Sequence, residues 1–192
     1  ALEPHRKYTT GIGEWAGKDI AEVEVPGFMP DNDTVRSDIL DYLFEIEWYD
    51  KHLGRIVAAL DSIGELDNTL IVLTSDNGMP FPRAKATLYD YGTHMPLAVY
   101  WKGKIMAGRK VTDFASLADI APTFLEAAGL DIPPQMTGKS LMPVLLSEKS
   151  GRVDPNRDHV YTARERHTWA YADGKTYPMR ALRDRKSTRL NS

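Results

Sequence analysis

Asp76 and Asn77 stand side by side after a short apolar run, and Arg83, Lys85 and His94 follow within one excursion of the chain. Carboxylate and amide oxygens are hard ligands that suit Ca²⁺ or Mg²⁺. Cationic side chains placed just after them could bind the oxygens of a metal-bound oxyanion. Because Ca²⁺ takes about 6 to 8 oxygens, two residues supply only part of a site, and the other ligands must come from outside this chain.

A purely structural interpretation of the same residues stays open. The Asn-Gly dipeptide at position 77 forms tight turns, and Lys85 could be an ordinary surface lysine. Two features favour chemistry. A buried strand leads into the turn, and ligands bind in loops at the carboxyl ends of strands in α/β sheets. Pro80 and Pro82 then give the chain an exit path that is not a hairpin.

The elements that must position these residues can be predicted from periodicity. The apolar run at 70–73 and the run at 97–101 predict strands that are buried on both faces. Between Asp33, a candidate N-cap, and Gly64, a candidate C-terminal glycine, apolar residues recur with the spacing of one long helix. Acidic residues of this helix, Asp41 among them, are expected on its solvated face. A helix followed by a strand is a step of a layered α/β fold.

Later elements follow from the same kinds of signal. Ser116 and Asp119 fit a capping box at the start of a helix that ends at Gly129, so Asp119 is expected to be a cap and not a catalytic base. The remaining predicted elements are a short helix ending at Leu146 and strands at 159–162 and 179–183.

Composition excludes several function classes. The chain has 192 residues and a net charge of -3, so no bulk basic field indicates a nucleic-acid partner. No apolar run approaches the roughly 20 residues that span a bilayer. The chain contains no cysteine, which excludes disulfides and thiolate metal sites within it. Since it begins at Ala1 without a methionine, we expect it to begin in the middle of a longer protein.

The motifs Ser-Asp-Asn-Gly at 75–78 and Lys-Ala-Thr-Leu-Tyr-Asp-Tyr-Gly-Thr-His-Met-Pro-Leu at 85–97 resemble the sulfatase family of the alkaline-phosphatase superfamily. The form of residues 76–85 is most similar to the heparan N-sulfatase, or sulfamidase, branch. The resemblance runs from about Glu3 to about Arg183 and covers the later part of a sulfatase. It implies an α/β fold, the later part of a mixed-sheet sandwich with the start of a small antiparallel C-terminal subdomain.

The resemblance also implies boundaries. Residues 1–147 would be the later part of the catalytic α/β domain, and 148–185 would begin the C-terminal subdomain. Residues 186–192 do not continue the resemblance and are expected to be a non-native tail.

The site residues can be carried over one by one. Asp76 and Asn77 match metal ligands, with Ca²⁺ ahead of Mg²⁺, and an Asp-Asp pair near the sulfatase N-terminus would complete the site. Lys85 and His5 match residues that meet the sulfate group and so would be catalytic, while His94 is expected to have a supporting role. The loop after residue 163 matches the rim of the substrate pocket, with Arg164, Glu165 and His167 as substrate contacts.

The expected activity is hydrolysis of a sulfuric ester or sulfamate on sulfated sugars of the N-sulfoglucosamine type, as in glycosaminoglycan degradation. Sulfatases use a formylglycine made from the Cys or Ser of a Cys/Ser-x-Pro-x-Arg motif. No such segment stands here, so this fragment alone should be inactive and the motif should precede it. The family implies a periplasmic or secreted protein, lysosomal in a eukaryote, and leaves a homodimer open.

Two other functions remain open at this stage. The protein could be another hydrolase of the superfamily, such as a phosphodiesterase or phosphonate hydrolase. It could also be a non-catalytic relative that binds glycans. Upstream sequence separates the three, because only a sulfatase needs the formylglycine motif.

Overall fold

The computed structural model describes residues 5, 7–165, 178–186 and 188–191. Its helices and short 3₁₀ turns are α1 (Ile12–Trp15), η1 (Ile20–Glu22), α2 (Asp33–Ser62), η2 (Leu66–Asn68), α3 (Asp90–Thr93), η3 (Leu117–Asp119), α4 (Ile120–Ala127) and α5 (Met142–Leu145). Its strands are β1 (Ile71–Thr74), β2 (Leu97–Tyr100), β3 (His159–Arg164), β4 (Met179–Asp184) and β5 (Thr188–Asn191).

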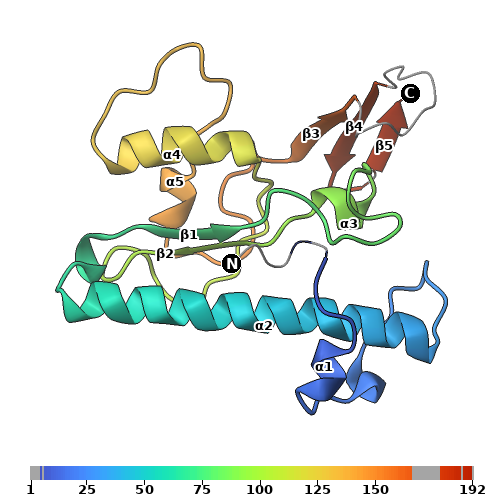
Figure 1. Ribbon diagram of the computed structural model, residues 1–192. Coiled ribbons are helices and arrows are strands. Elements are labelled where there is room, and N and C mark those ends of the chain that lie inside the picture. The colour runs from blue at the N-terminus through green and yellow to red at the C-terminus, as the bar shows by residue number, and fades with distance from the viewer. Residues whose placement is uncertain (1–4, 6, 166–177, 187, 192) are drawn as a thin grey trace.

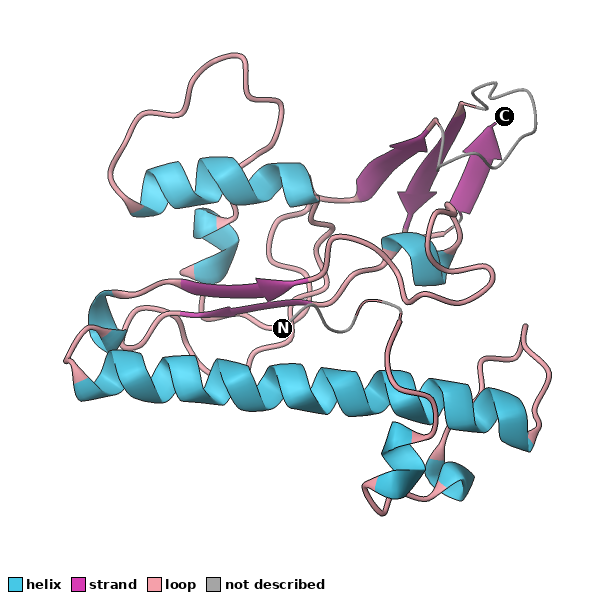
Figure 2. Ribbon diagram, viewed as in Figure 1, coloured by secondary structure: helices cyan, strands magenta, loops and turns pink. Residues whose placement is uncertain are grey.

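The described strands form two separate sheets. The pair β1–β2 is drawn between the long helix α2 on one side and the helices α4 and α5 on the other (Figure 1). The three-stranded sheet β3–β4–β5 lies apart from that pair, close to the single turn of α3 (Figures 1 and 2). The structure is therefore mixed α/β, as predicted, and its described sheets are small and antiparallel.

Helix α2 has the predicted extent. It begins at Asp33, and the Asn32 Oδ1 atom caps it by accepting a hydrogen bond of 3.0 Å from the Val35 N–H. The prediction that Asp33 is the N-cap was wrong, because the cap is the preceding residue, Asn32. At the other end Gly64 has a φ of 76° and donates its N–H to the Asp61 carbonyl at 3.0 Å, which confirms the predicted C-terminal glycine.

Asp41 lies in the interior and not on a solvated face. Its side chain is among the largest that are fully buried, with a residue exposure of 2%. The Asp41 Oδ2 atom accepts a hydrogen bond from the Gly11 N–H at 2.7 Å, and Oδ1 accepts one from the Gly13 N–H at 2.9 Å. The expectation from sequence was wrong because α1 folds over this face of α2 and its free N–H groups need an acceptor there.

Strands β1 and β2 pair antiparallel, with Ile71 opposite Tyr100. The prediction that both strands are buried on both faces is wrong for the described chain. All four residues of β1 are half-buried, and in β2 Leu97 and Tyr100 are 40% and 42% exposed. One face is covered where Val72 and Phe124 line a small apolar cavity between the strand pair and α4.

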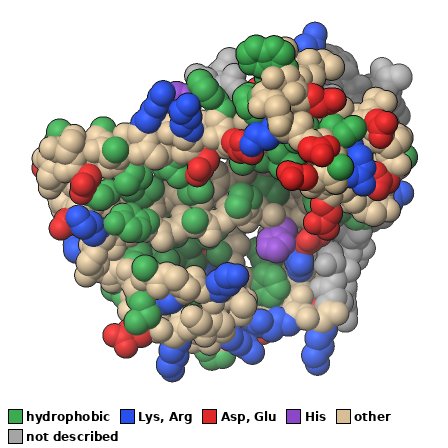
Figure 3. All heavy atoms as spheres, turned by 90° about the horizontal axis from the view of Figure 1, so that it is seen from below, with side chains coloured by type: hydrophobic (Ala, Val, Ile, Leu, Met, Phe, Trp, Pro, Cys, Tyr) green, Lys and Arg blue, Asp and Glu red, His purple; other side chains and the backbone are tan. Residues whose placement is uncertain are grey.

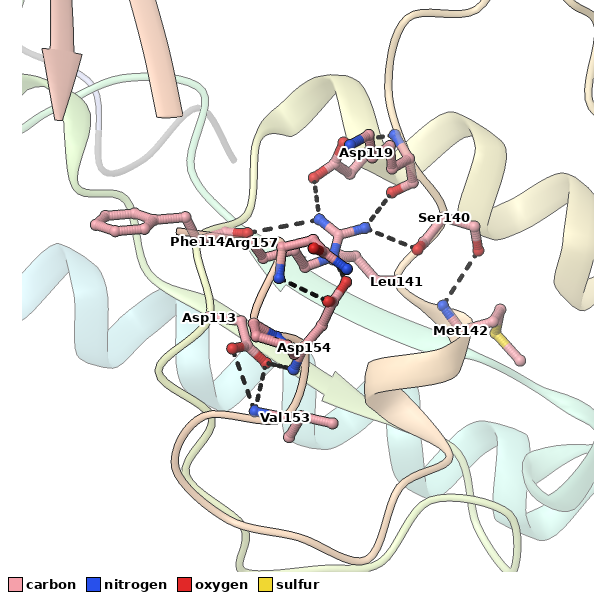
Figure 4. Close-up of polar contacts among 12 residues, drawn as sticks. Asp113, Phe114, Asp119, Ser140, Leu141, Met142, Val153, Asp154 and Arg157 are labelled. Carbon is pink, nitrogen blue, oxygen red and sulfur yellow. Dashed lines mark hydrogen bonds and ion pairs between the residues drawn. The ribbon is translucent and has the colours of Figure 1, made fainter. Parts of the chain in front are cut away.

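Asp119 and Arg157 form a buried ion pair beneath α4 (Figure 4). The predicted capping box of Ser116 and Asp119 is confirmed. In addition, the Arg157 Nη1–H donates to Asp119 Oδ2 at 2.8 Å, and Nη2–H donates to the carbonyls of Lys139 and Ser140 at 2.7 and 2.8 Å. One guanidinium thus joins the start of α4 to the chain ahead of α5.

Replacing Arg157 by alanine is expected to lower the free energy of unfolding of the chain by about 3 to 5 kcal/mol, because it leaves the buried Asp119 carboxylate without its cation. Urea unfolding of the variant measures the loss. The exposed Arg152 gives a matched control, and its replacement by alanine should cost less than about 0.5 kcal/mol. Equal losses in the two variants would contradict this role of the pair.

The described C-terminal sheet consists of β3, β4 and β5. Strands β3 and β4 include the predicted strands at 159–162 and 179–183 and are longer than predicted. Residues 188–191, set aside from sequence as part of a non-native tail, pair antiparallel with β4. Among the described residues, no helix has both the length and the apolar character that a membrane span requires.

Candidate functional site

The turn at 75–78 follows β1 directly and is tightly built. The Ser75 hydroxyl donates to the Asn77 carbonyl at 2.8 Å, which closes the turn. Gly78 is buried against α3, where a Cβ atom would lie only 2.1 Å from the Tyr91 carbonyl oxygen. Only glycine fits this close approach, so the turn is fixed both by its own hydrogen bond and by its contact with α3.

Asp76 and Asn77 present two hard oxygen ligands. The Asp76 side chain is exposed, and the Asn77 Nδ2–H donates to the Gly78 carbonyl at 3.0 Å, which leaves the amide oxygen available as an acceptor. Within the described ranges, no group of three or more His, Cys, Asp or Glu side chains could hold a metal ion by itself. The two residues therefore fit one side of a hard-cation site and do not complete it.

Lys85 stands on a second turn with strained backbone. The Lys85 N–H donates to the Met79 carbonyl at 3.0 Å. Its neighbours Arg83 and Ala86 have φ values of 58° and 63°, in the left-handed region that residues with a Cβ rarely adopt. Such conformations persist where the surroundings enforce them and are common at functional sites. Here Ala84, which has no exposed surface, anchors the turn in the interior.

His5 and Lys85 are brought together although 80 positions separate them in the sequence. The His5 Nε2 atom lies 3.3 Å from the Lys85 Nζ atom, and the ammonium can donate a hydrogen bond when Nε2 carries no proton. Both side chains had been predicted to meet the same anionic group. Side chains this close together can reach one and the same group, and their roles there stay a prediction.

His94 and Asp90 lie at the two ends of α3. The His94 Nδ1 atom is 3.5 Å from the Asp90 Oδ2 atom, and both side chains are exposed. The other Asp90 oxygen is paired with the Arg183 guanidinium from β4. Sequence reasoning assigned nothing to Asp90, and the only available signal was its place inside the 85–97 motif.

Arg164 and Glu165 lie at the end of the C-terminal sheet that is opposite to the Asp90–Arg183 pair. Arg164 is opposite Met179 at the start of β4, whereas Arg183 is near the end of β4 and opposite Val160. The Nε atom of Arg164 is buried without a hydrogen-bond partner among the described residues, and Glu165 is exposed. His167, the third predicted substrate contact, lies outside the described residues.

Known proteins are similar to this chain in sequence and in fold. A family profile described as Sulfatase matches residues 2–130. The human N-sulphoglucosamine sulphohydrolase is 30% identical over 91% of the chain and 35% of its own length. An N-acetylglucosamine-6-O-sulfatase of Bacteroides thetaiotaomicron is 39% identical over 63% of the chain and 22% of its own length.

One solved structure resembles this chain in fold. It holds a protein in complex with its substrate D-glucosamine-2-N,6-O-disulfate, and it aligns with a TM-score of 0.69 at 29% identity. The alignment covers 83% of this chain and 33% of that one. The chain therefore spans about a third or less of the length of these three proteins.

Proposed function

This chain belongs to the sulfatase family, and from that premise we propose that the full-length protein containing it hydrolyses sulfate groups on sulfated sugars. The observation that carries the proposal is the convergence of His5 and Lys85, 3.3 Å apart. Lys85 lies in the loop between β1 and α3 that also carries Asp76 and Asn77, and all four residues are within the part of the chain that matches the family.

Asp76 and Asn77 would hold one side of a divalent cation through a carboxylate oxygen and an amide oxygen. Ca²⁺ fits this donor set better than Zn²⁺, which favours nitrogen and sulfur ligands. The larger and more variable coordination of Ca²⁺ also suits a site shared with another part of the protein better than the strict octahedron of Mg²⁺. When bound, such a cation would polarise the oxygens of a sulfate group.

Lys85 and His5 would act on the sulfate group itself. The Lys85 ammonium is a compact positive charge that can stabilise negative charge developing on a sulfate oxygen. His5 can hold or transfer a proton at Nε2, and this atom faces Lys85. In this division of roles Lys85 supplies charge and His5 supplies a proton to the leaving atom.

The nucleophile is proposed to be a formylglycine outside these residues. The chain contains no cysteine and no Ser-x-Pro-x-Arg segment from which it could be made. The fragment alone is therefore proposed to be inactive, and every activity test below uses the full-length enzyme.

The proposed substrate class is glucosamine bearing an N-sulfate, with 6-O-sulfated glucosamine as the nearest competitor. The human relative that aligns with 91% of the chain is named for the first chemistry, and the bacterial relative with 39% identity is named for the second. Arg164, Glu165 and His167 are proposed to contact the sugar at the rim of the pocket.

We expect the purified full-length enzyme to release sulfate from glucosamine N-sulfate at least about tenfold faster, by kcat/KM, than from glucosamine 6-O-sulfate, since contacts to a distinct polar group separate related substrates by that factor or more. Ion chromatography of released sulfate makes the comparison. A preference for the 6-O-sulfate would overturn the finer assignment. Turnover of a phosphodiester with no sulfate release would overturn the sulfatase proposal, and sugar binding without turnover would favour a non-catalytic relative.

A further inference from the structure

The single turn of α3 packs against both segments of the candidate site. On one side the Tyr91 carbonyl fills the space at Gly78, beside the two oxygen ligands. On the other side Gly92 is so close to the Lys85 turn that a Cβ atom there would lie 2.5 Å from the carbonyl oxygens of both Ala84 and Thr87. A shift of α3 must therefore move the oxygen ligands, the Lys85 turn, or both.

A residue from the C-terminal sheet holds α3 from outside. The Arg183 Nη1 atom pairs with Asp90 Oδ1, at the first residue of α3. Arg183 lies in β4, the central strand of its sheet, and its backbone is paired on both sides, opposite Val160 and Thr188. The guanidinium therefore projects from a fixed point, whereas α3 is one turn within a long loop.

The Arg183–Asp90 pair is half-exposed, with side-chain exposures of 33% and 52%. Exposed ion pairs contribute little to global stability. We therefore do not expect the main effect of this pair to be on the free energy of unfolding. A second brace also supports α3, because the rings of Phe28 and Tyr91 pack edge to face with centroids 5.1 Å apart. Loss of the ion pair should thus loosen α3 without unfolding it.

We infer that Arg183 is a positioning residue, which acts through Asp90 and α3 to set the distance between the Asp76–Asn77 ligands and Lys85. The C-terminal sheet would then have a function beyond contributing rim residues. The catalytic consequence rests on the proposed sulfatase function, whereas the structural consequence does not.

Hydrogen exchange in the 192-residue chain tests the structural part. The Gly92 and His94 amides donate to the Tyr89 and Asp90 carbonyls at 2.9 and 2.8 Å, and these bonds report on α3. In the Arg183→Gln variant their exchange should become roughly fivefold faster. The matched control is Arg185→Gln on the same segment, which bonds to the Thr112 carbonyl instead and should leave these amides unchanged. Unchanged exchange in Arg183→Gln would overturn the inference.

Kinetics of the full-length enzyme test the catalytic part. Arg183→Gln should lower kcat roughly tenfold, the size of effect typical of residues that orient the groups in direct contact with a metal or substrate, while KM and the melting temperature change little. Reversing the pair with Asp90→Arg and Arg183→Asp should recover most of the lost kcat. A loss of kcat that follows the melting temperature, or a double variant no better than the single one, would contradict a positioning role.

If the wild type releases no sulfate, the proposed function fails, and the exchange result still decides the role of Arg183.

Discussion

Replacing Asp76 by alanine in the full-length enzyme is expected to lower kcat for sulfate release by at least about 1,000-fold. Residues that merely support a metal ligand already cost about 10- to 100-fold when they are changed, and Asp76 would supply a charged oxygen directly. With only Asn77 left, this side of the cation site would keep a single neutral oxygen. Steady-state kinetics at saturating sugar sulfate measure the loss.

The control for this prediction is Asp67→Ala, which removes another exposed carboxylate a few residues before the same strand. Asp67 pairs with Lys102 at 2.9 Å on the surface, and its loss should leave kcat within about twofold of the wild type. An Asp76→Ala enzyme that keeps about a tenth of wild-type turnover would contradict the assignment of Asp76 as a metal ligand.

Lys85→Ala is expected to lower kcat by about 100- to 1,000-fold, the cost of removing one group that stabilises charge in a transition state. Lys85→Arg should recover only part of this loss, because a planar guanidinium on a longer stem does not place its charge at the same point. Lys110, which is exposed, gives the control, and Lys110→Ala should not change kcat. A Lys85→Ala variant within about threefold of the wild type would mean that the contact with His5 is only structural.

Local signals predicted the elements well. The span of α2 and the capping box of Ser116 and Asp119 depend on residues a few positions apart, so the sequence contains the whole signal. The turn after β1 was predicted for the same reason. An apolar run such as 70–73 indicates that a strand will be covered, but not which part of the chain covers it or how completely. The burial of β1 was predicted wrongly for this reason.

Contacts between distant residues were not predictable from one sequence. Asp41 is buried because Gly13, 28 positions earlier, donates to it, and Arg157 meets Asp119 across 38 positions. The pair of Asp90 and Arg183 is of the same kind, because its geometry depends on how a separate sheet sits against α3. The approach of His5 to Lys85 was expected only through a family resemblance, and no spacing rule could have supplied it.

Calcium-dependent sulfate release tests the proposed site most directly. Full-length enzyme stripped of metal by a chelator would be assayed on glucosamine N-sulfate before and after Ca²⁺ is restored, in the wild type and in Asp76→Ala. Sulfate release that stops on stripping, returns with Ca²⁺ in the wild type and does not return in the variant is the predicted result. Sulfate release that is unaffected by stripping, or that Ca²⁺ restores equally in both enzymes, would contradict a calcium site at Asp76 and Asn77.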